Sequence, residues 1–270
     1  MPGHMEDPMA KKANQARLLI GTTGYRHETW TGPFYPEELD EDEWLGYYAE
    51  RFDTLELDTT FYRLPPPALI DAWREGTPAR FLFAMRGNKI ITHNRMLVGC
   101  AEELSRFRMA ATRLGKKLGP ILWQLPPAME LELSRLARFL RVVTQTFRTR
   151  HAVEFRHPRW HTAGTYKLLN RLGVAMVFTD VRRATIDSPL TADFVYCRRY
   201  GPGGSYGKPY TFRALRVEAE RIAGWRAEGR DVYVYFHNVH EGYAVRNARM
   251  LRELCGQVPS PAEKPQNATE

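Results

Sequence analysis

The stretch "HAVEFRHPRW", residues 151–160, starts as a short apolar run and ends in charged side chains just before Pro158. Successive residues of a strand face opposite sides, so Val153 and Phe155 are expected to share one face. Glu154 and Arg156 would then share the other face. A buried strand has no reason to end on charged groups unless its end opens onto something. The stretch therefore predicts a buried strand whose carboxyl end lies at a polar opening.

Comparable runs occur along most of the chain and decide the fold class. We expect eight strands, at residues 18–22, 54–58, 81–86, 120–125, 151–156, 174–180, 193–199 and 231–238. Between most of them apolar residues repeat at helical spacing, most clearly at 101–117, 131–147 and 212–229. Repeated alternation of strand and helix indicates a parallel sheet, and eight repeats indicate closure into a barrel. The prediction is an α/β fold, a single (β/α)8 barrel of the TIM type. It is irregular, because the connection between strands 6 and 7, residues 181–192, is too short for a long helix.

Length and composition fit one domain. The chain has 270 residues, and we expect a flexible segment at 1–17, the barrel at 18–256 and a disordered tail at 257–270. The formal charge of +8 favours an anionic partner, a small molecule or nucleic acid, although such charge also serves solubility. Three scattered cysteines without a Cys-x-x-Cys pair argue against disulfides and for a reducing, cytoplasmic location. No apolar run approaches the ~20 residues of a membrane span, so no membrane partner is expected. The oligomeric state stays open.

Polar side chains gather at the carboxyl ends of the expected strands. On the faces that point into the barrel the alternation places Glu56, Asp58, Arg86, Gln124, Glu154, Arg156, Arg198 and His237, with Asp180 closing the sixth strand. Barrels of this type build their sites at that mouth. The alternative is a structural network of salt bridges inside the barrel. So many charged and amide groups at one rim favour a functional site.

Two loop features add to the mouth. The loops after the first and second strands supply Tyr25, Trp30, Phe61 and Tyr62, and each loop also contains an arginine. The aromatic rings can stack on bases or sugars, or they can pack under their own loops. The Gly-rich stretch "YGPGGSYGKPY", residues 200–210, follows the seventh strand, where barrel enzymes often bind phosphate through backbone N–H groups.

Several chemistries lack their motif. There is no Gly-x-Ser-x-Gly, no Walker loop and no His-Glu-x-x-His. The fourth and seventh strands end in Gln124 and Arg198, so the paired carboxylates of a common barrel glycosidase are missing. A divalent metal held by Glu154, Asp180 and His237 is chemically possible, but nothing in the spacing demands it and a neighbouring arginine would oppose a cation.

Several motifs in series resemble a known family. They are "IGTTGYRHETWTGPFYP" (20–36), "FDTLELDTTFYRLP" (52–65), "FLFAMRGNKIITH" (81–93), "KLGPILWQLPP" (117–127), "AVEFRHPRW" (152–160), "TADFVYCRRYG" (191–201) and "DVYVYFHNVHEGYAVRNA" (231–248). In order and content they resemble the family catalogued as domain of unknown function 72, also called YecE-like. The resemblance implies a barrel related to the TIM type and no established reaction. The residues that match the family's pattern are Glu56, Gln124, Glu154, Arg156, His157 and Asn238. The sequence departs from it at Arg86, usually Lys, at His237, usually Asn, and in the seventh loop, which lacks the usual His.

These observations give a set of candidate site residues. The predicted catalytic residues are Glu154, Glu56, His157 and Asp180. The predicted substrate-binding residues are Arg156, Arg198, Lys89, His93, Gln124, Tyr62, Asp58, His237 and Asn238. The first hypothesis is an enzyme of the phosphoester hydrolase kind on a phosphorylated or nucleic-acid substrate, with Glu154 as general base or metal ligand and Glu56 orienting it. The second is a non-catalytic module for nucleic acid or nucleotides, and the third a metal-dependent sugar isomerase or lyase.

Overall fold

The strands of the chain form one parallel ring. The computed structural model describes residues 16–181 and 188–257. The strands are β1 (Leu18–Thr22), β2 (Thr54–Leu57), β3 (Leu82–Arg86), β4 (Leu118–Leu125), β5 (His151–Phe155), β6 (Ala175–Thr179), β7 (Phe194–Arg199) and β8 (Asp231–Phe236). Neighbours in the ring are parallel, and β1 pairs with β8. Between β1 and β2 the strand pairing is reduced to a single bridge, Thr23 to Glu56, although the two strands pack closely. The predicted barrel is confirmed, and each predicted strand lies within two residues of its observed ends.

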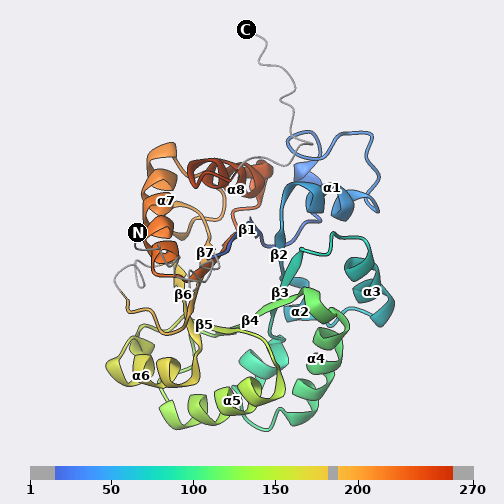
Figure 1. Cartoon of the computed structure of the whole chain (residues 1–270). Coiled ribbons are helices and arrows are strands. Elements are labelled where there is room, and N and C mark those ends of the chain that lie inside the picture. Colours follow the sequence, from blue (N-terminus) through green and yellow to red (C-terminus); the bar gives the residue numbers. More distant parts are fainter. Residues whose placement is uncertain (1–15, 182–187, 258–270) are drawn as a thin grey trace, which may run out of the picture.

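Helices surround the ring on its outside (Figure 1). They are α1 (Trp44–Arg51), α2 (Thr59–Tyr62), α3 (Pro67–Glu75), α4 (Ala101–Arg113), α5 (Leu133–Thr146), α6 (Ala163–Leu172), α7 (Phe212–Ala227) and α8 (Tyr243–Leu254). In α5 the buried side chains are Leu136, Phe139, Leu140 and Val143, which agrees with the helical spacing of apolar residues in 131–147. Helix α7 begins after Thr211, whose hydroxyl accepts the Ala214 N–H at 3.2 Å. It ends before Gly229, whose positive φ of 78° suits the predicted end.

The connection from β6 to β7 contains no long helix in its described residues, as the sequence predicted. Residues 182–187 lie outside the described part of the chain. The predicted boundaries at residues 17 and 256 remain predictions, because residues 1–15 and 258–270 are not described either. No helix among the described residues combines the length and the apolar character needed to cross a lipid bilayer.

Strand alternation divides the core into two layers. Leu55, Val153 and Val234 face the helices and belong to the larger apolar cluster. Ala152, Tyr196 and Tyr235 point into the barrel and belong to a smaller inner cluster. Further along the same inward faces the strands carry charged residues instead. The inside of the barrel is therefore apolar at its amino end and polar at its carboxyl end.

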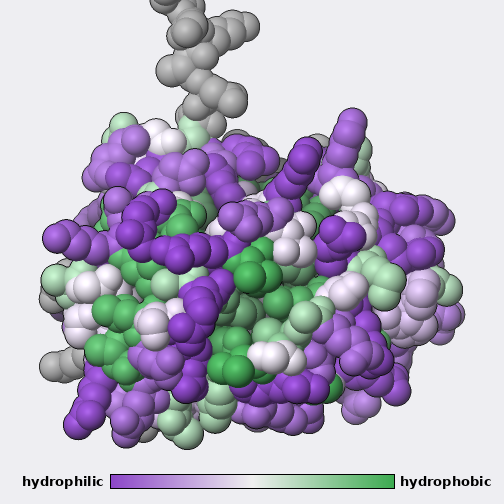
Figure 2. Space-filling view, turned by 90° about the horizontal axis from the view of Figure 1, so that it is seen from below, coloured by the Kyte–Doolittle hydropathy of each residue, from purple (hydrophilic) through white to green (hydrophobic). Residues whose placement is uncertain are grey.

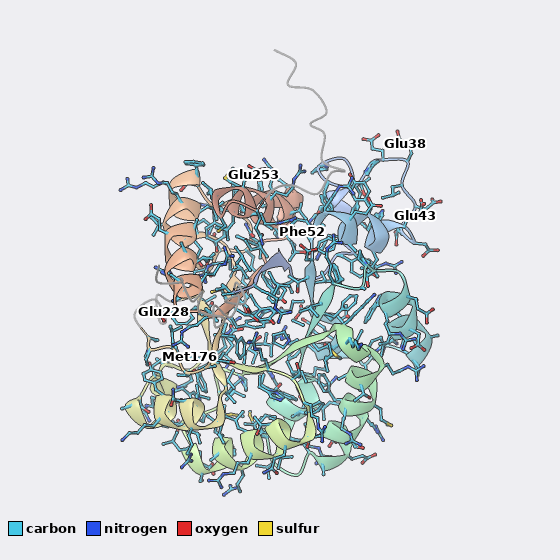
Figure 3. The ribbon with its side chains drawn as sticks, viewed as in Figure 1. Glu38, Glu43, Phe52, Met176, Glu228 and Glu253 are labelled. Carbon is cyan, nitrogen blue, oxygen red and sulfur yellow. The ribbon has the colours of Figure 1, made fainter. Side chains whose placement is uncertain are left out.

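The outer surface is mostly hydrophilic. In Figure 3 the exposed Glu38, Glu43, Glu228 and Glu253 lie at the periphery, whereas Phe52 and Met176 are buried. Figure 2 shows one side of the molecule, where hydrophilic residues alternate with hydrophobic ones that gather near the centre of the view. The charged residues inside the barrel are therefore unusual in their environment, and they carry the functional argument.

Candidate functional site

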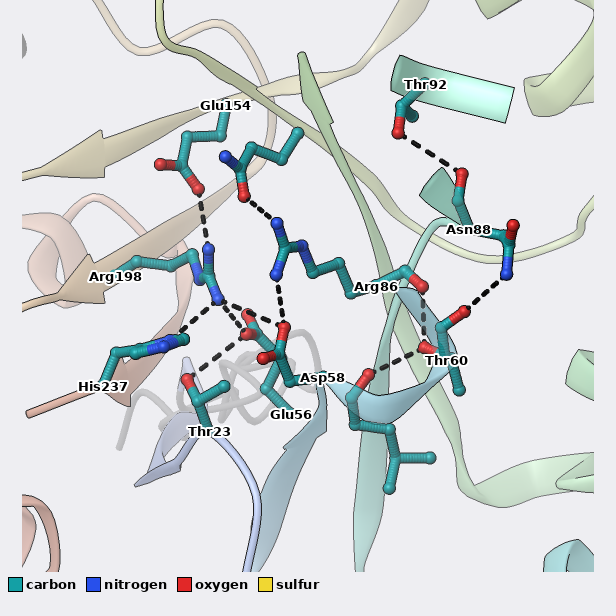
Figure 4. A network of polar contacts seen from close by, with 12 residues as sticks. Thr23, Glu56, Asp58, Thr60, Arg86, Asn88, Thr92, Glu154, Arg198 and His237 are labelled. Carbon is teal, nitrogen blue, oxygen red and sulfur yellow. Dashed lines mark hydrogen bonds and ion pairs between the residues drawn. The ribbon is translucent and has the colours of Figure 1, made fainter. Parts of the chain in front are cut away.

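Arg198 lies at the centre of a charged cluster at the carboxyl end of the barrel (Figure 4). It stands on β7 with a side-chain exposure of 0%. Its Nη2 donates to Oε1 of Glu56 at 2.7 Å, and its Nη1 donates to Oε2 of Glu154 at 3.0 Å. Both carboxylates are also fully buried. Charges so deep in a protein need partners and hydrogen bonds, and here each has them.

The two buried glutamates have their oxygens taken. The hydroxyl of Tyr196 donates to Oε2 of Glu56 at 2.6 Å. The hydroxyl of Tyr200 donates to Glu154 at 3.0 Å, and Nε of Arg156 lies 2.7 Å from Oε1 of Glu154. Burial raises the pKa of Glu56, although Arg198 opposes this. These contacts fit residues that position their neighbours better than residues that meet a substrate directly.

A second ion pair lies closer to solvent. Nη1 of Arg86 donates to Oδ1 of Asp58 at 2.6 Å, while its Nη2 donates to the side-chain oxygen of Gln124. The guanidinium also lies over the ring of Phe61, 3.7 Å from its centroid. The Asp58 side chain is 22% exposed. Burial alone would raise the pKa of Asp58, but Arg86 and Arg198 outweigh it and hold that pKa below its ordinary value, so the carboxylate is ionised at neutral pH.

Two histidines at the mouth are held neutral. Nδ1 of His237 lies 3.1 Å from Nη2 of Arg198, and its ring stacks on Tyr200. Burial, reinforced by Arg198, lowers the pKa of His237 to about 3. Burial, reinforced by two arginines, lowers the pKa of His93 to about 4. At neutral pH neither ring adds positive charge to the site. We call the set Glu56, Asp58, Arg86, Gln124, Glu154, Arg156, Arg198 and His237 the mouth cluster.

Two hollows open at the mouth cluster. The larger, which we call the large cleft, measures about 460 Å³, and its walls include Tyr25, His27, Asp58, Tyr62, Trp73 and His237. The smaller, which we call the Arg156 pocket, measures about 160 Å³ and is lined by Pro127, Phe155, Arg156, His157, Pro158, His161, Thr179 and Val181. Asp58 and His237 of the mouth cluster therefore line the large cleft, and Arg156 lines the Arg156 pocket.

Some predicted site residues stay at the rim or outside the cluster. Tyr62 is 63% exposed, and the Lys89 ammonium lies 5.7 Å from its ring centroid. Nδ1 of His157 accepts the Arg159 N–H at 3.2 Å and so caps the turn Pro158–Trp160. Asn238 is buried and donates to Lys208 O and to Asn247, each at 3.0 Å. These contacts give the asparagine an anchoring role between the seventh loop and α8.

Asp180 does not join the mouth cluster. Its Oδ1 accepts the backbone N–H of Tyr200 at 3.0 Å, and its Oδ2 accepts the hydroxyl of Tyr210. Burial raises the pKa of Asp180. The side chain lines a different hollow of about 420 Å³ beside α7. The expectation that it acts with Glu154 is therefore not supported by its position.

The metal site that seemed possible is not assembled. Among the described residues no group of three or more His, Cys, Asp and Glu side chains is close enough to hold a metal ion. The reason lies in the partners of the three proposed ligands, because Glu154 and His237 face guanidiniums and Asp180 faces Tyr210. In the described part of the chain these three side chains therefore do not converge on one ion, a site that the sequence left only as a chemical possibility.

The Gly-rich loop also differs from its expected role. The Gly204 N–H donates to Gly201 O at 2.8 Å, and the Ser205 N–H donates to Pro202 O at 3.3 Å. The Gly201 N–H donates to the hydroxyl of Tyr210 at 2.8 Å. These donors stabilise the loop itself and are not free for a phosphate. What the loop adds to the site is Tyr206, whose ring packs edge-on against Tyr200 and His237.

Sequence reasoning missed three members of the network. Tyr200 follows β7 by one residue and was treated as part of the loop, although it lies two residues after Arg198 and so shares its inward face. Thr23 donates to Glu56 at 3.3 Å from just beyond β1. His161 lines the Arg156 pocket from beyond the turn at Pro158–Trp160. Tyr200 and Thr23 each extend the inward face of a strand by one residue, so strand alternation gave a signal for these two but not for His161.

Comparison with known proteins identifies the family. A sequence model described as "Protein of unknown function DUF72" matches residues 19–269. The chain belongs to the DUF72 family. Two curated proteins are similar to this DUF72 chain. The YecE protein of Escherichia coli (strain K12) is 31% identical over 171 residues, which cover 61% of this chain and 60% of that protein's length. The YunF protein of Bacillus subtilis (strain 168) is 24% identical over 270 residues, covering 88% of this chain and 94% of that protein.

Solved DUF72 structures share the barrel. A DUF72 family protein from Thermotoga maritima has a TM-score of 0.78 at 24% identity, and the match covers 89% of this chain and 99% of that one. A DUF72 family protein from Enterococcus faecalis has a TM-score of 0.76 at 17% identity, with 93% and 99% covered. At these identities the likeness shows the fold alone, so the activity has to be argued from the mouth cluster itself.

Proposed function

We propose that the mouth of the barrel binds a small anionic molecule of the phosphorylated kind, with Arg156 as the anchor for the anion. One observation carries the proposal. Arg86 and Arg198 use both terminal nitrogens on protein partners, whereas Nη1 and Nη2 of Arg156 make no hydrogen bond to any described residue. A guanidinium with its terminal donors open matches the two oxygens of a phosphate or carboxylate.

The surroundings of Arg156 support this role. Its Nε lies against Glu154, and its guanidinium carbon lies 4.6 Å from the ring centroid of Tyr200. The side chain is held from behind, remains 15% exposed and lines the Arg156 pocket beside His157 and His161. A pocket of about 160 Å³ suits one anionic group rather than a whole ligand. The large cleft, at about 460 Å³, falls in the range of small-molecule sites, roughly 300–1,000 Å³, and suits the body of the ligand.

The proposal changes the roles of the two glutamates. Glu154 and Glu56 act by holding Arg156 and Arg198 in place, because their oxygens are occupied. The members of the mouth cluster that a ligand in the large cleft meets are Asp58 and His237. In an enzyme of the phosphoester hydrolase kind, an acid or base from the mouth cluster would be one of these two and not Glu154. The predicted cytoplasmic location rests on the cysteine pattern and stays a prediction.

A nucleic-acid ligand is the second candidate. The observation in its favour is the exposed ring of Tyr62 with the Lys89 ammonium near it, a pairing that can stack a base and contact its phosphate. Its affinity would fall steeply with salt, since several phosphates would each release counterions. A single anion in the Arg156 pocket would show a much shallower dependence on salt.

Calorimetric titration tests the proposal. The probes are inorganic phosphate, ribose 5-phosphate and a single-stranded oligonucleotide, each at about 50 and 200 mM salt. We expect Arg156→Ala to weaken the binding of both phosphate probes by at least roughly tenfold, the value of one charge-assisted contact. Arg216→Ala is the matched control, because Arg216 lies on α7 with its side chain 62% exposed. Phosphate binding that ignores Arg156→Ala, or no phosphate binding by the wild-type protein, would refute the proposal.

A further inference from the structure

The contact between Arg198 and His237 decides which nitrogen of the histidine carries its proton. Nη2 of Arg198 lies 3.1 Å from Nδ1 of His237. A guanidinium has donors and no acceptor, so Nδ1 must accept this hydrogen bond. The neutral ring therefore carries its hydrogen on Nε2. The hydrogen bond from Arg198 therefore sets the tautomer of His237.

The ring is also fixed in place. It stacks on Tyr200 with the ring centroids 5.1 Å apart, and Tyr206 packs against it edge-on at 5.5 Å. Its backbone N–H donates to Arg199 O at 2.7 Å. The charged groups that act on it are Arg198, Arg86 and Arg156, which oppose protonation, and Asp58, which favours it. Burial is the largest influence and, with the arginines, keeps the ring neutral.

The Nε2 edge of the His237 ring opens into the large cleft. Nε2 of His237 has no hydrogen-bond partner among the described residues, and the ring lines the large cleft together with Asp58. Oδ1 of Asp58 lies 3.9 Å from the same Nη2 of Arg198, while Oδ2 makes no hydrogen bond within the described chain. A donor on His237, held by Arg198, and an acceptor on Asp58, held by Arg86, therefore line the same cleft.

We propose that His237 is a ligand-binding residue whose Nε2–H donates to an uncharged oxygen of the ligand, while Asp58 accepts a hydrogen bond from a hydroxyl beside it. The ligand class that fits is a polyhydroxylated, sugar-like body. The inference rests on the proposed function, because it names the part of the same ligand that occupies the large cleft. A second phosphate is a poor fit at this position, since the Asp58 carboxylate would repel it. The walls supply Tyr25, Tyr62 and Trp73, whose rings suit the apolar faces of a sugar.

The tautomer can be measured without knowing the natural ligand. In protein labelled with ¹⁵N-histidine, long-range proton–nitrogen correlation spectra report the hydrogen on each ring nitrogen. We expect His237 to carry its hydrogen on Nε2 and to stay unprotonated from about pH 5 to 8. Its pKa would then lie well below the ordinary histidine value of about 6.5. The exposed His240 of the same protein serves for comparison. A hydrogen on Nδ1, or protonation with a midpoint near 6.5, would overturn the proposal.

Two variants separate this inference from the proposed function. His237→Asn keeps a neutral acceptor and donor, and we expect ribose 5-phosphate to bind within about threefold of the wild-type affinity. His237→Phe removes both, and we expect roughly tenfold weaker binding of ribose 5-phosphate with inorganic phosphate unaffected. If both probes ignore His237→Phe while Arg156→Ala weakens them, the inference fails and the anion site stands. If inorganic phosphate does not bind at all but the Nε2–H tautomer is found and neutral ribose binding depends on His237, the anion site fails instead.

Discussion

Replacing Arg198 with methionine tests whether the centre of the mouth cluster is held by its charge. Methionine keeps an apolar stem of similar shape and removes every donor. Glu56 then loses the cation at 2.7 Å, and both its oxygens remain fully buried. Glu154 loses one partner and keeps Arg156, whose Nε lies 2.7 Å away. The perturbation therefore isolates one buried carboxylate without an ion partner.

The expected cost follows from that single loss. Removing one member of a buried ion pair costs about 3–5 kcal/mol, because the other charge remains desolvated. The hydroxyl of Tyr196 still donates to Glu56 at 2.6 Å, so we place Arg198→Met at about 4 kcal/mol at pH 8. Domains of this kind are stable by roughly 5–15 kcal/mol, so the variant should remain folded and measurable.

The sign of the pH dependence follows from the pKa of Glu56. Burial already raises that pKa, and the loss of Arg198 raises it further above the unfolded value of about 4.3. A carboxyl whose pKa is higher in the folded state does no harm below its unfolded pKa. It destabilises the fold increasingly as pH rises through the folded pKa. The deficit of Arg198→Met should therefore be smaller at pH 5 than at pH 8.

Urea unfolding followed by circular dichroism at pH 5 and pH 8 measures both effects. The free energy of unfolding is extrapolated linearly to zero urea, and its slopes against urea concentration are compared between the variant and the wild-type protein. Arg216→Met, on the exposed side of α7, is the control and should change stability by less than about 0.5 kcal/mol. If Arg198→Met lowered the free energy of unfolding by less than about 1 kcal/mol at pH 8, or equally at both pH values, Glu56 would not depend on the charge of Arg198.

Two further predictions concern the barrel outside the mouth cluster. A Cβ on Gly21 would lie 2.2 Å from Thr54 O, so Gly21→Ala should destabilise the protein by about 3 kcal/mol and lower its melting temperature. The control is Gly224→Ala on α7, where a Cβ would meet nothing within 4 Å. This variant should be neutral or stabilising. Equal melting temperatures would contradict the close approach of β1 and β2. Burial would raise the pKa of Asp231, but hydrogen bonds from two arginines outweigh it and hold that pKa below its ordinary value. Its contribution is present above the unfolded pKa and disappears as pH falls, so Asp231→Asn should destabilise the protein at pH 7 and much less at pH 3 in urea titrations. An equal loss of stability at pH 7 and pH 3 would show that the arginines do not lower the pKa of Asp231.

Strand alternation predicted the faces of the barrel but not the partners of its charges. Apolar neighbours at Leu55, Val153 and Phe155 turned Glu56, Glu154 and Arg156 inward, and the structure confirms this. Which charge meets which depends on the order of strands around the ring. Arg198 pairs with a glutamate 44 residues away and another 142 residues away, and no local pattern encodes either distance.

Loops limited the prediction of the site for a different reason. A Gly-rich sequence says that the backbone can turn, not whether its N–H groups are left free, and residues 201–208 bond largely to themselves and to Tyr210. Asp180 shows the same limit, because its partner Tyr210 lies on the far side of that loop. Side chains at the end of a strand converge only when the following loop leaves the space open.

The mouth cluster divides into residues that hold their neighbours in place and residues that can contact a ligand. Arg198, Glu56 and Glu154 are fully buried, and an apolar core of the same volume would usually serve stability as well or better. Stability alone is therefore a weak reason for placing them there. Their contribution is geometric, because Glu154 holds Arg156 from behind and Arg198 holds the His237 ring. If the cluster were only a structural network, its exposed members would be expected to close on each other. Instead Arg156, Asp58 and His237 each keep a donor or acceptor open toward a hollow, and this is the arrangement that a ligand requires.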